Sequence, residues 1–579
     1  MFGTLLQKPF QWLRGAARFK TLWLGGPLLL YGWTLTGPFL SDDLHLMLKA
    51  ERYLRGESQA LDLFRFARSD DEWRELRNQG SCAWWQPDGW RPDYVRPIAS
   101  GSFLLDVFVF GRNPFGYRLV SLGVFAIALV CVHWLFRQAT DDPVRPGVAT
   151  FLFGISQGLV QPVTWLSSRS DLLVVIGVSL AAGAYWAAYR RPSLKWGLLA
   201  VAAFAFALFS KEVAVALAAV IGMHEWVRRR HPGPVQPNRA TSWIAAVLAT
   251  MAIAFIAYYI HSRPWILSPP HGDGGPAQSG MRILQALLLY ASVWTTGYPI
   301  DTFLLGASRW HLWTVATVGG LLLLVTIGYM RRSTRGDRAA LFFVLWAPAL
   351  LLPGLGGMTT TNRVMCAATV GWAFLLAGLI VPRREADAAP LFLRHFLFAA
   401  NTTVSIGCVI GTVLVMNHAE WRARDRLAGV VAELDSSLSD GDTLLVRESR
   451  GPLEISCGAE RLELLTGRRH VALTYLLPPD VEGEWQRVDP RTVIVRARDG
   501  GLFNTLLYES SSGHDSRAPA GETFRLRGFT IEVEETGEGD DFTVLALRFT
   551  EPLSSPRMHL VPPPVGPKAT STVAKTGDP

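Results

Sequence analysis

The 579-residue sequence is poor in charge, because only 18% of its residues are Asp, Glu, Lys or Arg while 49% are hydrophobic. Soluble chains carry roughly a quarter charged residues. This shortage, together with long apolar runs, excludes a soluble multidomain enzyme. The chain also has no glycine period, and its 21 Trp and 30 Phe residues exclude collagen-like structure and general disorder.

Motifs of several common enzyme classes are also missing. No Gly-rich nucleotide loop, zinc-binding cluster or Ser-His-Asp spacing stands out, so the sequence does not support a soluble nucleotide-sugar donor. Only five cysteines are present. Three lie within apolar runs, and Cys82 and Cys457 are both expected outside the cytoplasm, where a disulfide between them can form.

Acidic residues are scarce before Met416 and abundant after it. The part after Met416 holds 19 basic and 26 acidic residues, whereas the part before it holds 37 basic and 22 acidic residues. An excess of Lys and Arg in an apolar chain is typical of the cytoplasmic loops of membrane proteins, and it predicts no nucleic-acid partner. We therefore expect a basic membrane body in the lipid bilayer, followed by an acidic, water-soluble domain.

Eleven apolar segments approach the length of about 20 residues that a membrane span needs. They are 21–40, 116–136, 147–166, 171–189, 196–210, 212–227, 241–260, 310–330, 339–356, 364–381 and 396–416. Residues 283–300 are apolar too, but they are short and end in Gly297 and Pro299. We predict an interfacial or re-entrant helix there, and a twelfth span is the alternative.

The basic clusters predict the orientation in the membrane. Every cluster lies before the first span or after an even-numbered span: 8–20, 137–145, 190–195, 228–230, 331–338 and 383–394. By the positive-inside rule all of these are cytoplasmic, so the N-terminus is cytoplasmic and the acidic domain is extracytoplasmic. The Ala-, Arg- and Gly-rich composition fits a bacterial inner membrane.

The predicted fold is an all-α polytopic membrane bundle of about 11 transmembrane helices with a small C-terminal α+β extracytoplasmic domain. A helix over 420–438 is expected in that domain. Its expected strands cover 443–446, 471–475, 492–495, 524–533 and 542–549. The predicted organisation is a cytoplasmic leader 1–20 (an amphipathic helix or a solvated segment), a membrane domain 21–416 with a large first outer loop 41–115, the α+β domain 417–551 and a disordered tail 552–579.

Ionisable residues gather at the outer ends of the spans. Asp42, Asp43 and His45 follow the first span. The other outer turns contribute Arg96, Arg169, Asp171, Lys211, Glu212 and Arg363. A charge near mid-span costs about 2.5–3.5 kcal/mol and less near the interface. These side chains either reach toward the interface and form ion pairs with one another, or they line one polar cavity that opens outward.

Each group in this set has a chemistry that it could perform. Asp42 or Asp43 could act as a general base on an incoming hydroxyl, or hold a divalent metal (Mg²⁺ or Mn²⁺) with His45. The alternative is that Ser41 and Asp42 only cap the following helix. The cations Arg96, Arg169, Lys211 and Arg363 suit a phosphate group. A lipid-linked phosphate would reach such a site from the bilayer, with its chain left in the lipid.

Four segments resemble the GT-C superfamily of membrane glycosyltransferases, which use polyprenyl-phosphate-linked sugars. The nearest branch is similar to protein O-mannosyltransferases, including transmembrane enzymes with tetratricopeptide repeats. The segments are Pro38-Phe-Leu-Ser-Asp-Asp-Leu-His45, Tyr94-Val-Arg-Pro-Ile98 with Leu105-Asp106 and Phe110–Tyr117, Ser168-Arg-Ser-Asp-Leu-Leu173, and Leu208-Phe-Ser-Lys-Glu212. The likeness covers about 40–230 well and the later spans in outline.

The resemblance implies a catalytic acid at Asp42 or Asp43, with a slight preference for Asp43, and sugar transfer with inversion. It implies that Arg96 and Lys211 lie near the donor phosphate, and that Asp171 and Glu212 orient them or contact the sugar. The implied partners are a polyprenyl-phosphate-linked sugar and a glycan, lipid or protein acceptor; metal use stays open. Two features depart from the branch: no tetratricopeptide repeat is visible, and the first outer loop carries an insert, Ser69 to Trp90.

A transporter or flippase for polar lipids or glycans is the alternative function. Such a protein tends to show inverted repeats and polar groups at the membrane midplane, and neither is clear in this sequence. A ligase or a non-catalytic scaffold is a further alternative. Replacing Asp42 and Asp43 by Asn distinguishes these functions from a transferase. Only a transferase would lose sugar transfer while the protein still folds and inserts into the membrane.

Overall fold

The computed structural model describes residues 20–561 except 59–60, 87–91, 231–237, 264–275, 299–308, 334–336, 356–360, 383–388, 435–437, 450–451, 478–482, 498–519 and 537–541. The chain divides into two compact units. Unit 1 comprises Met1–Ser69, Gly89–Asn417 and Glu509–Asp515, and unit 2 comprises Asp70–Asp88, His418–Tyr508 and Ser516–Pro579. The predicted leader 1–20 lies almost wholly outside the described residues.

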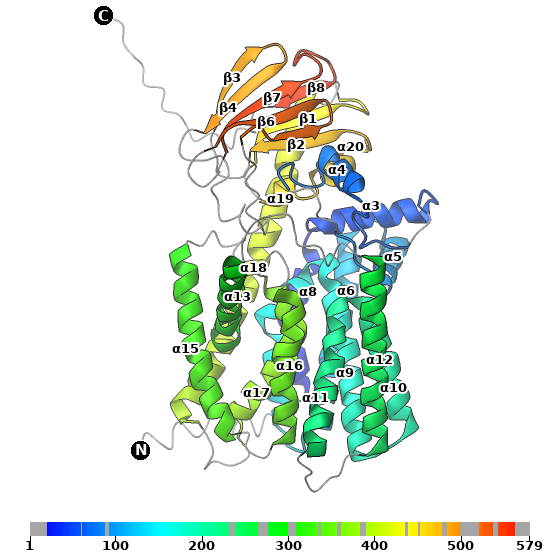
Figure 1. Ribbon diagram of the computed structural model, residues 1–579, viewed down its shortest axis with the longest axis vertical. Coiled ribbons are helices and arrows are strands. Elements are labelled where there is room, and N and C mark those ends of the chain that lie inside the picture. Colours follow the sequence, from blue (N-terminus) through cyan, green and yellow to red (C-terminus); the bar gives the residue numbers. More distant parts are fainter. Residues whose placement is uncertain are drawn as a thin grey trace, which may run out of the picture. The chain divides into compact units, whose positions relative to one another are not determined.

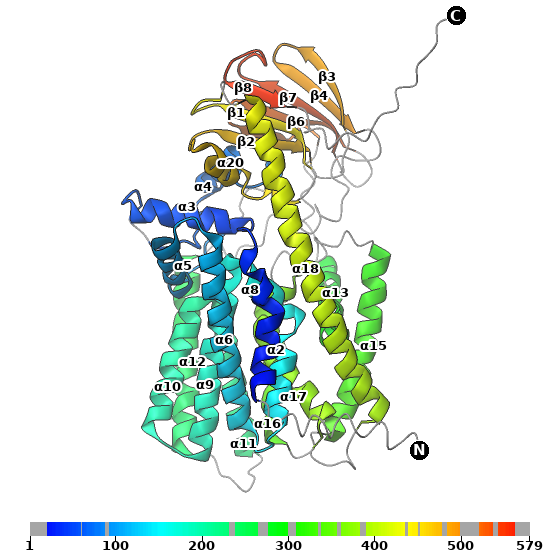
Figure 2. The same ribbon diagram turned by 180° about the vertical axis from the view of Figure 1, so that it is seen from behind.

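Unit 1 is a bundle of helices (Figures 1 and 2). Its elements are α2 (Lys20–Gly32), η1 (Trp33–Thr36), α3 (Asp42–Leu54), α5 (Pro97–Phe110), α6 (Pro114–Ala139), α7 (Arg145–Gly154), η2 (Gln157–Leu159), α8 (Val160–Thr164), η3 (Leu166–Ser168), α9 (Arg169–Arg190), α10 (Leu194–Ser210), η4 (Glu212–Val215), α11 (Ala216–Arg230), α12 (Arg239–Ser262), α13 (Pro276–Thr296), α15 (Arg309–Ser333), α16 (Arg338–Leu355), η6 (Asn362–Met365), α17 (Cys366–Ile380) and the first part of α18 (Leu391–Leu434).

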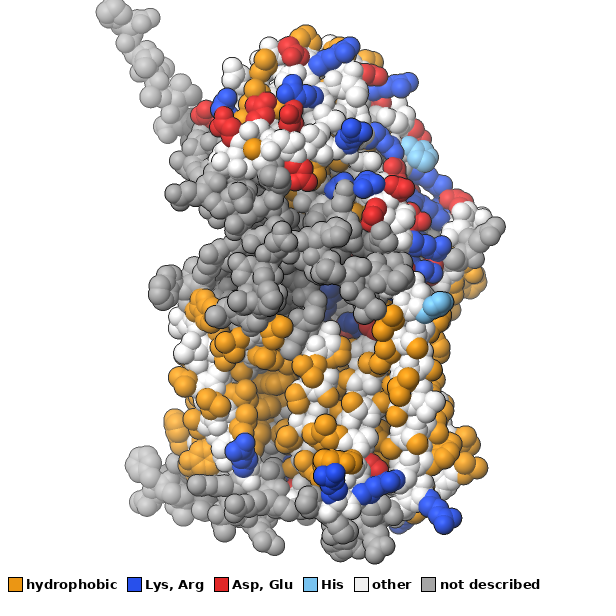
Figure 3. Space-filling model, viewed as in Figure 1, with side chains coloured by type: hydrophobic (Ala, Val, Ile, Leu, Met, Phe, Trp, Pro, Cys, Tyr) orange, Lys and Arg blue, Asp and Glu red, His pale blue; other side chains and the backbone are white. Residues whose placement is uncertain are grey.

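Within the described part of the chain, six helical stretches are long and apolar enough to cross a membrane. They are Pro114–Ala139, Leu166–Arg190, Arg239–Ser262, Trp313–Arg331, Asn362–Ile380 and Leu391–Leu434. Each coincides with one of the eleven predicted spans, and the other five spans stay predictions. Hydrophobic side chains cover much of the face of unit 1 shown in Figure 3, with Lys and Arg near its lower end. The fold class, a polytopic helical membrane protein with a small strand-containing domain, is confirmed.

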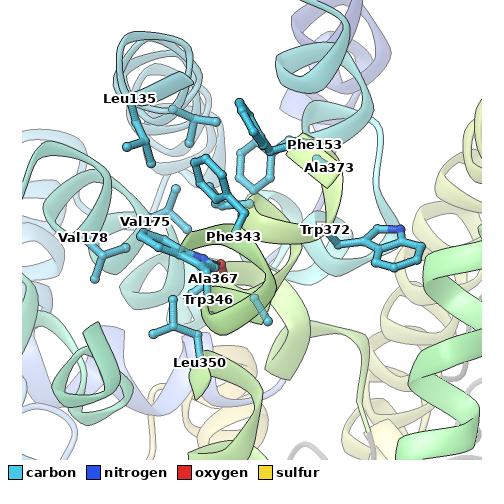
Figure 4. Close-up of a cluster of buried hydrophobic side chains, with 14 of the residues drawn as sticks. Leu135, Phe153, Val175, Val178, Phe343, Trp346, Leu350, Ala367, Trp372 and Ala373 are labelled. Carbon is cyan, nitrogen blue, oxygen red and sulfur yellow. Dashed lines mark hydrogen bonds between the residues drawn. The ribbon is translucent and has the colours of Figure 1, made fainter. Parts of the chain in front are cut away.

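Two stretches form the centre of the bundle. The apolar window of Leu166–Arg190 is 94% buried and that of Asn362–Ile380 is 89% buried, whereas that of Arg239–Ser262 is only 22% buried. Glycines allow close helix packing, because a Cβ at Gly177 would lie 2.7 Å from the Ala207 side chain. Aromatic side chains fill the remaining space, and Figure 4 shows Phe343 and Trp346 within this core. Trp346 satisfies its buried indole N–H with the Ala367 carbonyl at 2.8 Å.

One predicted span differs from the prediction, whereas the apolar segment 283–300 lies largely in a helix. The predicted span 147–166 is not one helix but the series α7, η2, α8 and η3, because Gly154, Gly158 and Pro162 interrupt it. Because of these breaks, η3 lies next to the acidic pair Asp42 and Asp43 described below. Residues 283–296 of the segment predicted as interfacial or re-entrant lie in α13, which packs along α15; within the described part of the chain, Ala286–Thr296 is among the shorter apolar helices.

Unit 2 contains two β-sheets with helices α4 (Asp70–Gln79), α19 (Pro452–Ile455), α20 (Gly458–Thr466) and the last part of α18. The strands are β1 (Thr443–Glu448), β2 (Ala472–Leu477), β3 (Gly483–Asp489), β4 (Thr492–Ala497), β5 (Thr523–Leu526), β6 (Phe529–Thr536), β7 (Phe542–Phe549) and β8 (Met558–Val561). A parallel sheet has the order β2-β1-β8, and an antiparallel sheet has the order β3-β4-β7-β6-β5.

Several expectations for this region are wrong. The last span and the predicted helix 420–438 are one helix, α18, because no Gly-Pro break separates them. The predicted strand 524–533 is the hairpin β5-β6, turned at Gly528 with φ +82°. Part of the tail predicted as disordered forms β8, which pairs with β1 from Thr443↔Met558 to Val446↔Val561. Residues 562–579 lie outside the described part. Cys82 and Cys457 are free thiols, so the disulfide is absent.

The insert in the first outer loop belongs to unit 2. Trp84 is 1% exposed and packs in the core of this unit, where its indole donates to the Leu476 carbonyl at 3.2 Å. Gly80, with φ +85°, lies so close to Leu473 that a Cβ would meet its carbonyl oxygen at 1.5 Å. Its own carbonyl accepts from the amide of Ala459 at 3.2 Å. The chain therefore leaves unit 1 within the first outer loop, completes the core of unit 2 and returns.

This arrangement predicts that Trp84→Ala destabilises unit 2 although Trp84 is distant from it in the sequence. Removing a buried Trp side chain costs about 3–5 kcal/mol. Trp421→Ala is the matched control, because Trp421 is in the same unit and 47% exposed. Hydrogen exchange of the purified full chain is expected to accelerate in β1 and β2 for Trp84→Ala only. Equal protection of these strands in both variants would contradict the shared core.

Candidate active site

The acidic pair lies where the first apolar helix ends and a polar helix begins. η1 ends at Thr36 and α3 begins at Asp42, with a short extended segment between them. Ser41 has φ 45° and ψ −118°, a conformation that non-glycine residues rarely adopt. Its side chain makes no capping hydrogen bond, so the helix-cap alternative does not hold for Ser41. Asp42 and Asp43 both stand in the first turn of α3, where free amides favour carboxylates.

Asp43 is fully buried and binds backbone amides from two parts of the chain. Its Oδ1 accepts from the amide of Ser167 at 2.7 Å, and its Oδ2 accepts from the amides of Leu40 at 2.9 Å and Leu166 at 3.4 Å. Burial raises the pKa of Asp43 to about 7, against the opposing effect of these amides and of Arg118. Both oxygens are engaged inside the protein, so Asp43 fixes η3 against the start of α3.

Asp42 has a different environment although it is the next residue. It is only partly buried, and its Oδ2 accepts a hydrogen bond from the Ser167 hydroxyl at 3.3 Å. Ser167 thus contacts both acids, one through its amide and the other through its hydroxyl. Asp42 is the member of the pair that keeps a carboxylate available to another molecule.

Two ion pairs lie at the ends of the neighbouring helices. Arg96 binds Glu212 in a bidentate manner, with Nε–Oε2 and Nη2–Oε1 distances of 3.1 and 2.5 Å. Lys211 donates to Asp171 Oδ1 at 2.7 Å. In both pairs a carboxylate fixes the position of a cation that the sequence assigned to the donor phosphate. Glu212 and Asp171, predicted to orient these cations or to contact the sugar, are thus the ion-pair partners of Arg96 and Lys211.

Tyr94 marks the point where the acidic and basic residues come together. Burial raises the pKa of its hydroxyl, and the charges of Arg96, Glu212, Arg363 and Asp42 also act on it. The Arg96 guanidinium lies over the Tyr94 ring, 4.3 Å from its centroid. Residues that are far apart in the sequence therefore surround one loop side chain.

Arg363 differs from the other cations of this site. It is partly buried, lies over the Trp165 ring with its Cζ 5.4 Å from the centroid, and donates to the Ser168 hydroxyl at 3.2 Å. Among the residues that the structure describes, no carboxylate forms an ion pair with Arg363. Unlike the charges of Arg96 and Lys211, its positive charge is not paired with a carboxylate within the described part of the chain, which suits it to an anionic ligand.

Arg169, unlike Arg363, is buried and bonded on all sides to groups of the protein itself. Its side chain is 3% exposed and forms an ion pair with Asp106. It also donates hydrogen bonds to the Ser102 hydroxyl at 3.0 Å, to the Ser121 hydroxyl at 2.9 Å and to the Tyr117 carbonyl at 2.9 Å. These contacts join α5, α6 and α9 and engage every nitrogen of the guanidinium. The sequence grouped Arg169 with the phosphate-binding cations because its outward position was visible and its partners were not.

Of the residues that the sequence offers as metal ligands, Asp43 and His45 already have partners inside the protein. Both Asp43 oxygens are bound to amides, and the His45 ring stacks on Phe66 with centroids 4.9 Å apart. The described residues include no group of three or more His, Cys, Asp or Glu side chains that could hold a metal ion.

Two further buried groups shape the loop and were missed in the sequence. Asp93 is 3% exposed and binds both Arg65, at 2.6 Å, and Arg263, at 3.0 Å, which fixes the end of the loop against the end of α12. Arg118, 2% exposed, lies in the first turns of α6 and donates to carbonyls of the segment that precedes Asp42. An Arg near the start of an apolar run was the available signal for Arg118.

The fold and the charged site describe a polytopic membrane protein with a polar site at the ends of its helices. No family model matches the chain. Over 230 residues it is 29% identical to Protein O-mannosyl-transferase Tmtc1 of Drosophila melanogaster, a match that covers 38% of this chain and 24% of the fly protein. The resemblance to the O-mannosyltransferase branch is thereby confirmed, although the match spans only about a quarter of that relative.

Solved structures give a more distant likeness. The archaeal oligosaccharyltransferase AglB from Archaeoglobus fulgidus matches with a TM-score of 0.42 at 11% identity, covering 79% of this chain and 65% of that one. ArnT from Cupriavidus metallidurans matches with a TM-score of 0.42 at 12% identity, covering 80% and 86%. The mycobacterial arabinofuranosyltransferase AftD gives 0.38 at 12%, covering 92% and 40%. TM-scores of this size do not assign a function.

The environment of Arg169 predicts that Arg169→Gln destabilises unit 1, since it leaves Asp106 buried and without its cation. Breaking such a buried pair costs about 3–5 kcal/mol. Arg190→Gln in the same helix is the control, because its partner Asp141 is 89% exposed and such pairs contribute about 0–1 kcal/mol. Thermal unfolding in detergent is expected to show a lower Tm for Arg169→Gln only. Equal Tm values would show that Arg169 does not stabilise the bundle.

The environment of Asp43 predicts a pH dependence of stability. Its folded-state pKa of about 7 exceeds the value of about 4 in an unfolded chain, so the folded state binds the proton more tightly. Stability from this group is therefore present at low pH and is lost as pH rises from about 4 to about 7, by at most about 4 kcal/mol. Relative to Asp43→Asn, the wild type should lose Tm between pH 4.5 and 7.5. A difference that grows in the opposite direction would mean that the amide bonds outweigh burial.

Proposed function

We propose that this protein transfers a sugar from a polyprenyl-phosphate donor to an acceptor hydroxyl at the extracytoplasmic face of the membrane. The observation that carries the proposal is that two groups lie at the same short segment. One is Asp42, a partly exposed carboxylate, and the other is Arg363, a cation without a carboxylate partner among the described residues. Both contact η3, through Ser167 and Ser168. A base and an anion-binding cation that contact adjacent residues of the same segment suit a reaction between a hydroxyl and a phosphate-linked sugar.

In this reaction Asp42 accepts the proton of the acceptor hydroxyl while the oxygen attacks C1 of the sugar. A bond forms between that oxygen and C1, the bond between C1 and the phosphate oxygen breaks, and its electron pair leaves with the lipid phosphate. One displacement of this kind inverts the configuration at C1. Arg363 stabilises the negative charge of the departing phosphate, and Arg96 and Lys211 stand by it in positions fixed by Glu212 and Asp171.

The geometry supports Asp42 as the base in place of the slight preference for Asp43. A general base must reach the hydroxyl whose proton it accepts. Asp43 is 0% exposed and directs both oxygens to backbone amides, whereas Asp42 is partly exposed. Asp43 then has a supporting role, since it fixes the loop that presents Asp42.

The similarity to a protein O-mannosyl-transferase supports a sugar transferase over a flippase. The donor lipid, the sugar and the acceptor class, whether glycan, lipid or protein, are part of the proposal. So are the bacterial inner membrane, the cytoplasmic N-terminus and the extracytoplasmic position of unit 2, which follow from the basic clusters.

The proposal predicts that Asp42→Asn abolishes transfer without unfolding the protein. The purified full chain in nanodiscs would receive undecaprenyl phosphate carrying mannose, glucose or galactose, with Ser/Thr peptides and a membrane lipid extract as acceptors. We expect one donor to be consumed with release of undecaprenyl phosphate, and loss of the base to lower the rate about 100- to 10,000-fold.

Asp71→Asn is the matched control, because Asp71 is also in the first turn of a helix but its side chain is 91% exposed in unit 2. It should keep the wild-type rate. Sugar transfer at an unchanged rate by Asp42→Asn, or no consumption of any donor by the wild type, would speak against the proposed function.

A further inference from the structure

Arg118 is a buried cation whose hydrogen bonds, among the described residues, go to one short segment of chain. It is 2% exposed, and its guanidinium donates to the carbonyl of Thr34 at 3.3 Å and to the carbonyl of Pro38 at closer range. Gly37 lies against the guanidinium so closely that a Cβ would be 2.6 Å from Cζ. The segment 34–38 therefore wraps around this side chain, and a Cβ at position 37 would displace the guanidinium.

The segment held by Arg118 leads directly to the acidic pair. Four residues after Pro38 comes Asp42, and Ser41 between them has the rarely adopted φ of 45°. A residue in such a conformation costs about 1–3 kcal/mol and persists only where its surroundings fix it. Here the segment is fixed on both sides, by Arg118 before Ser41 and by the amide bonds of Asp43 after it.

The positive charge of Arg118 and the negative charge of Asp43 also attract each other. Arg118 and Asp43 are both buried and act on one another electrostatically across the segment. Among the described residues, the hydrogen bonds of Arg118 go to backbone carbonyls inside the protein and not to Asp42. Its effect on the site can only be through the position of the chain that carries Asp42.

We propose that Arg118 is a positioning residue for Asp42: its bonds to the Thr34 and Pro38 carbonyls hold the strained chain at Ser41 that places the carboxylate at the acceptor hydroxyl. The inference rests on the proposed function. It assigns a role in the reaction to a residue of the second span that touches no substrate.

The test compares Arg118→Met, Arg118→Lys and Gly37→Ala in the full chain, with the undecaprenyl-phosphate sugar that the wild type consumes. Arg118→Met is expected to lower kcat at least 10-fold, with the KM for the donor within about 2-fold of wild type, because Asp42 is displaced while the phosphate-binding cations stay. Arg118→Lys should recover part of this loss, since an ammonium can reach one of the two carbonyls. Arg137→Met, at an exposed position in the last turn of the same helix, is the control and should keep the wild-type kcat.

Gly37→Ala disturbs the same contact by changing the backbone segment instead of Arg118. Its added Cβ displaces the guanidinium, so it should lower kcat like Arg118→Met. In the double variant the second change should add nothing, because the contact is already lost. Full multiplication of the two effects would overturn the proposal, and so would a wild-type kcat for Arg118→Met or a loss expressed only in KM.

Hydrogen exchange gives a readout that does not need activity. The amides of residues 39–43 should exchange faster in Arg118→Met and Gly37→Ala than in the wild type, while those of α9 stay protected. If Arg118→Met fails to fold, Gly37→Ala and Arg118→Lys decide the question by the same two measurements. Activity of Asp42→Asn would refute the proposed function; an inactive Asp42→Asn beside a fully active Arg118→Met would refute this inference alone.

Discussion

The site depends on one buried carboxylate that joins two segments of the chain. Asp43 accepts amides from Leu40 just before it and from Leu166 and Ser167, more than a hundred residues later. Amides at the broken end of the third apolar segment need acceptors, because water is scarce where they are buried. The carboxylate supplies these acceptors, and in doing so it sets the start of α3 against η3. The neighbouring Asp42, which follows the unusual backbone conformation of Ser41, stays partly exposed.

Charge pairing explains why so many ionisable groups are tolerated at the ends of apolar helices. Arg169 with Asp106 is a buried pair, and Arg96 with Glu212 and Lys211 with Asp171 are partly buried pairs. In each, the partner offsets the desolvation cost that a lone charge would have there. The pairs also fix the directions of their side chains. Arg363 stands out against this background, because the described residues supply no carboxylate for it.

The sequence predicted this set of residues better than it predicted their roles. Asp42, Arg96, Lys211, Glu212, Asp171 and Arg363 were recognised because they interrupt apolar runs on one predicted side of the membrane, and the structure brings them into one region. The roles of Asp43 and Arg169 could not be read in the same way. Whether a charged side chain faces a ligand or a buried partner depends on contacts such as those with Ser167 and Asp106, which lie far away in the sequence.

The sequence by itself determined the class of fold, because the signals for it are local. A membrane span needs a long apolar run, and a half-buried strand needs alternating apolar and polar residues, and each segment shows its own pattern. It therefore predicted the long helices, the change to an α+β domain after Met416 and most strands. Only the tertiary structure decided that the insert around Trp84 completes the core of unit 2, that Arg118 bonds to the chain before Asp42, and that two adjacent aspartates have different environments. These features rest on side chains that meet across long separations, and no local pattern encodes such a meeting.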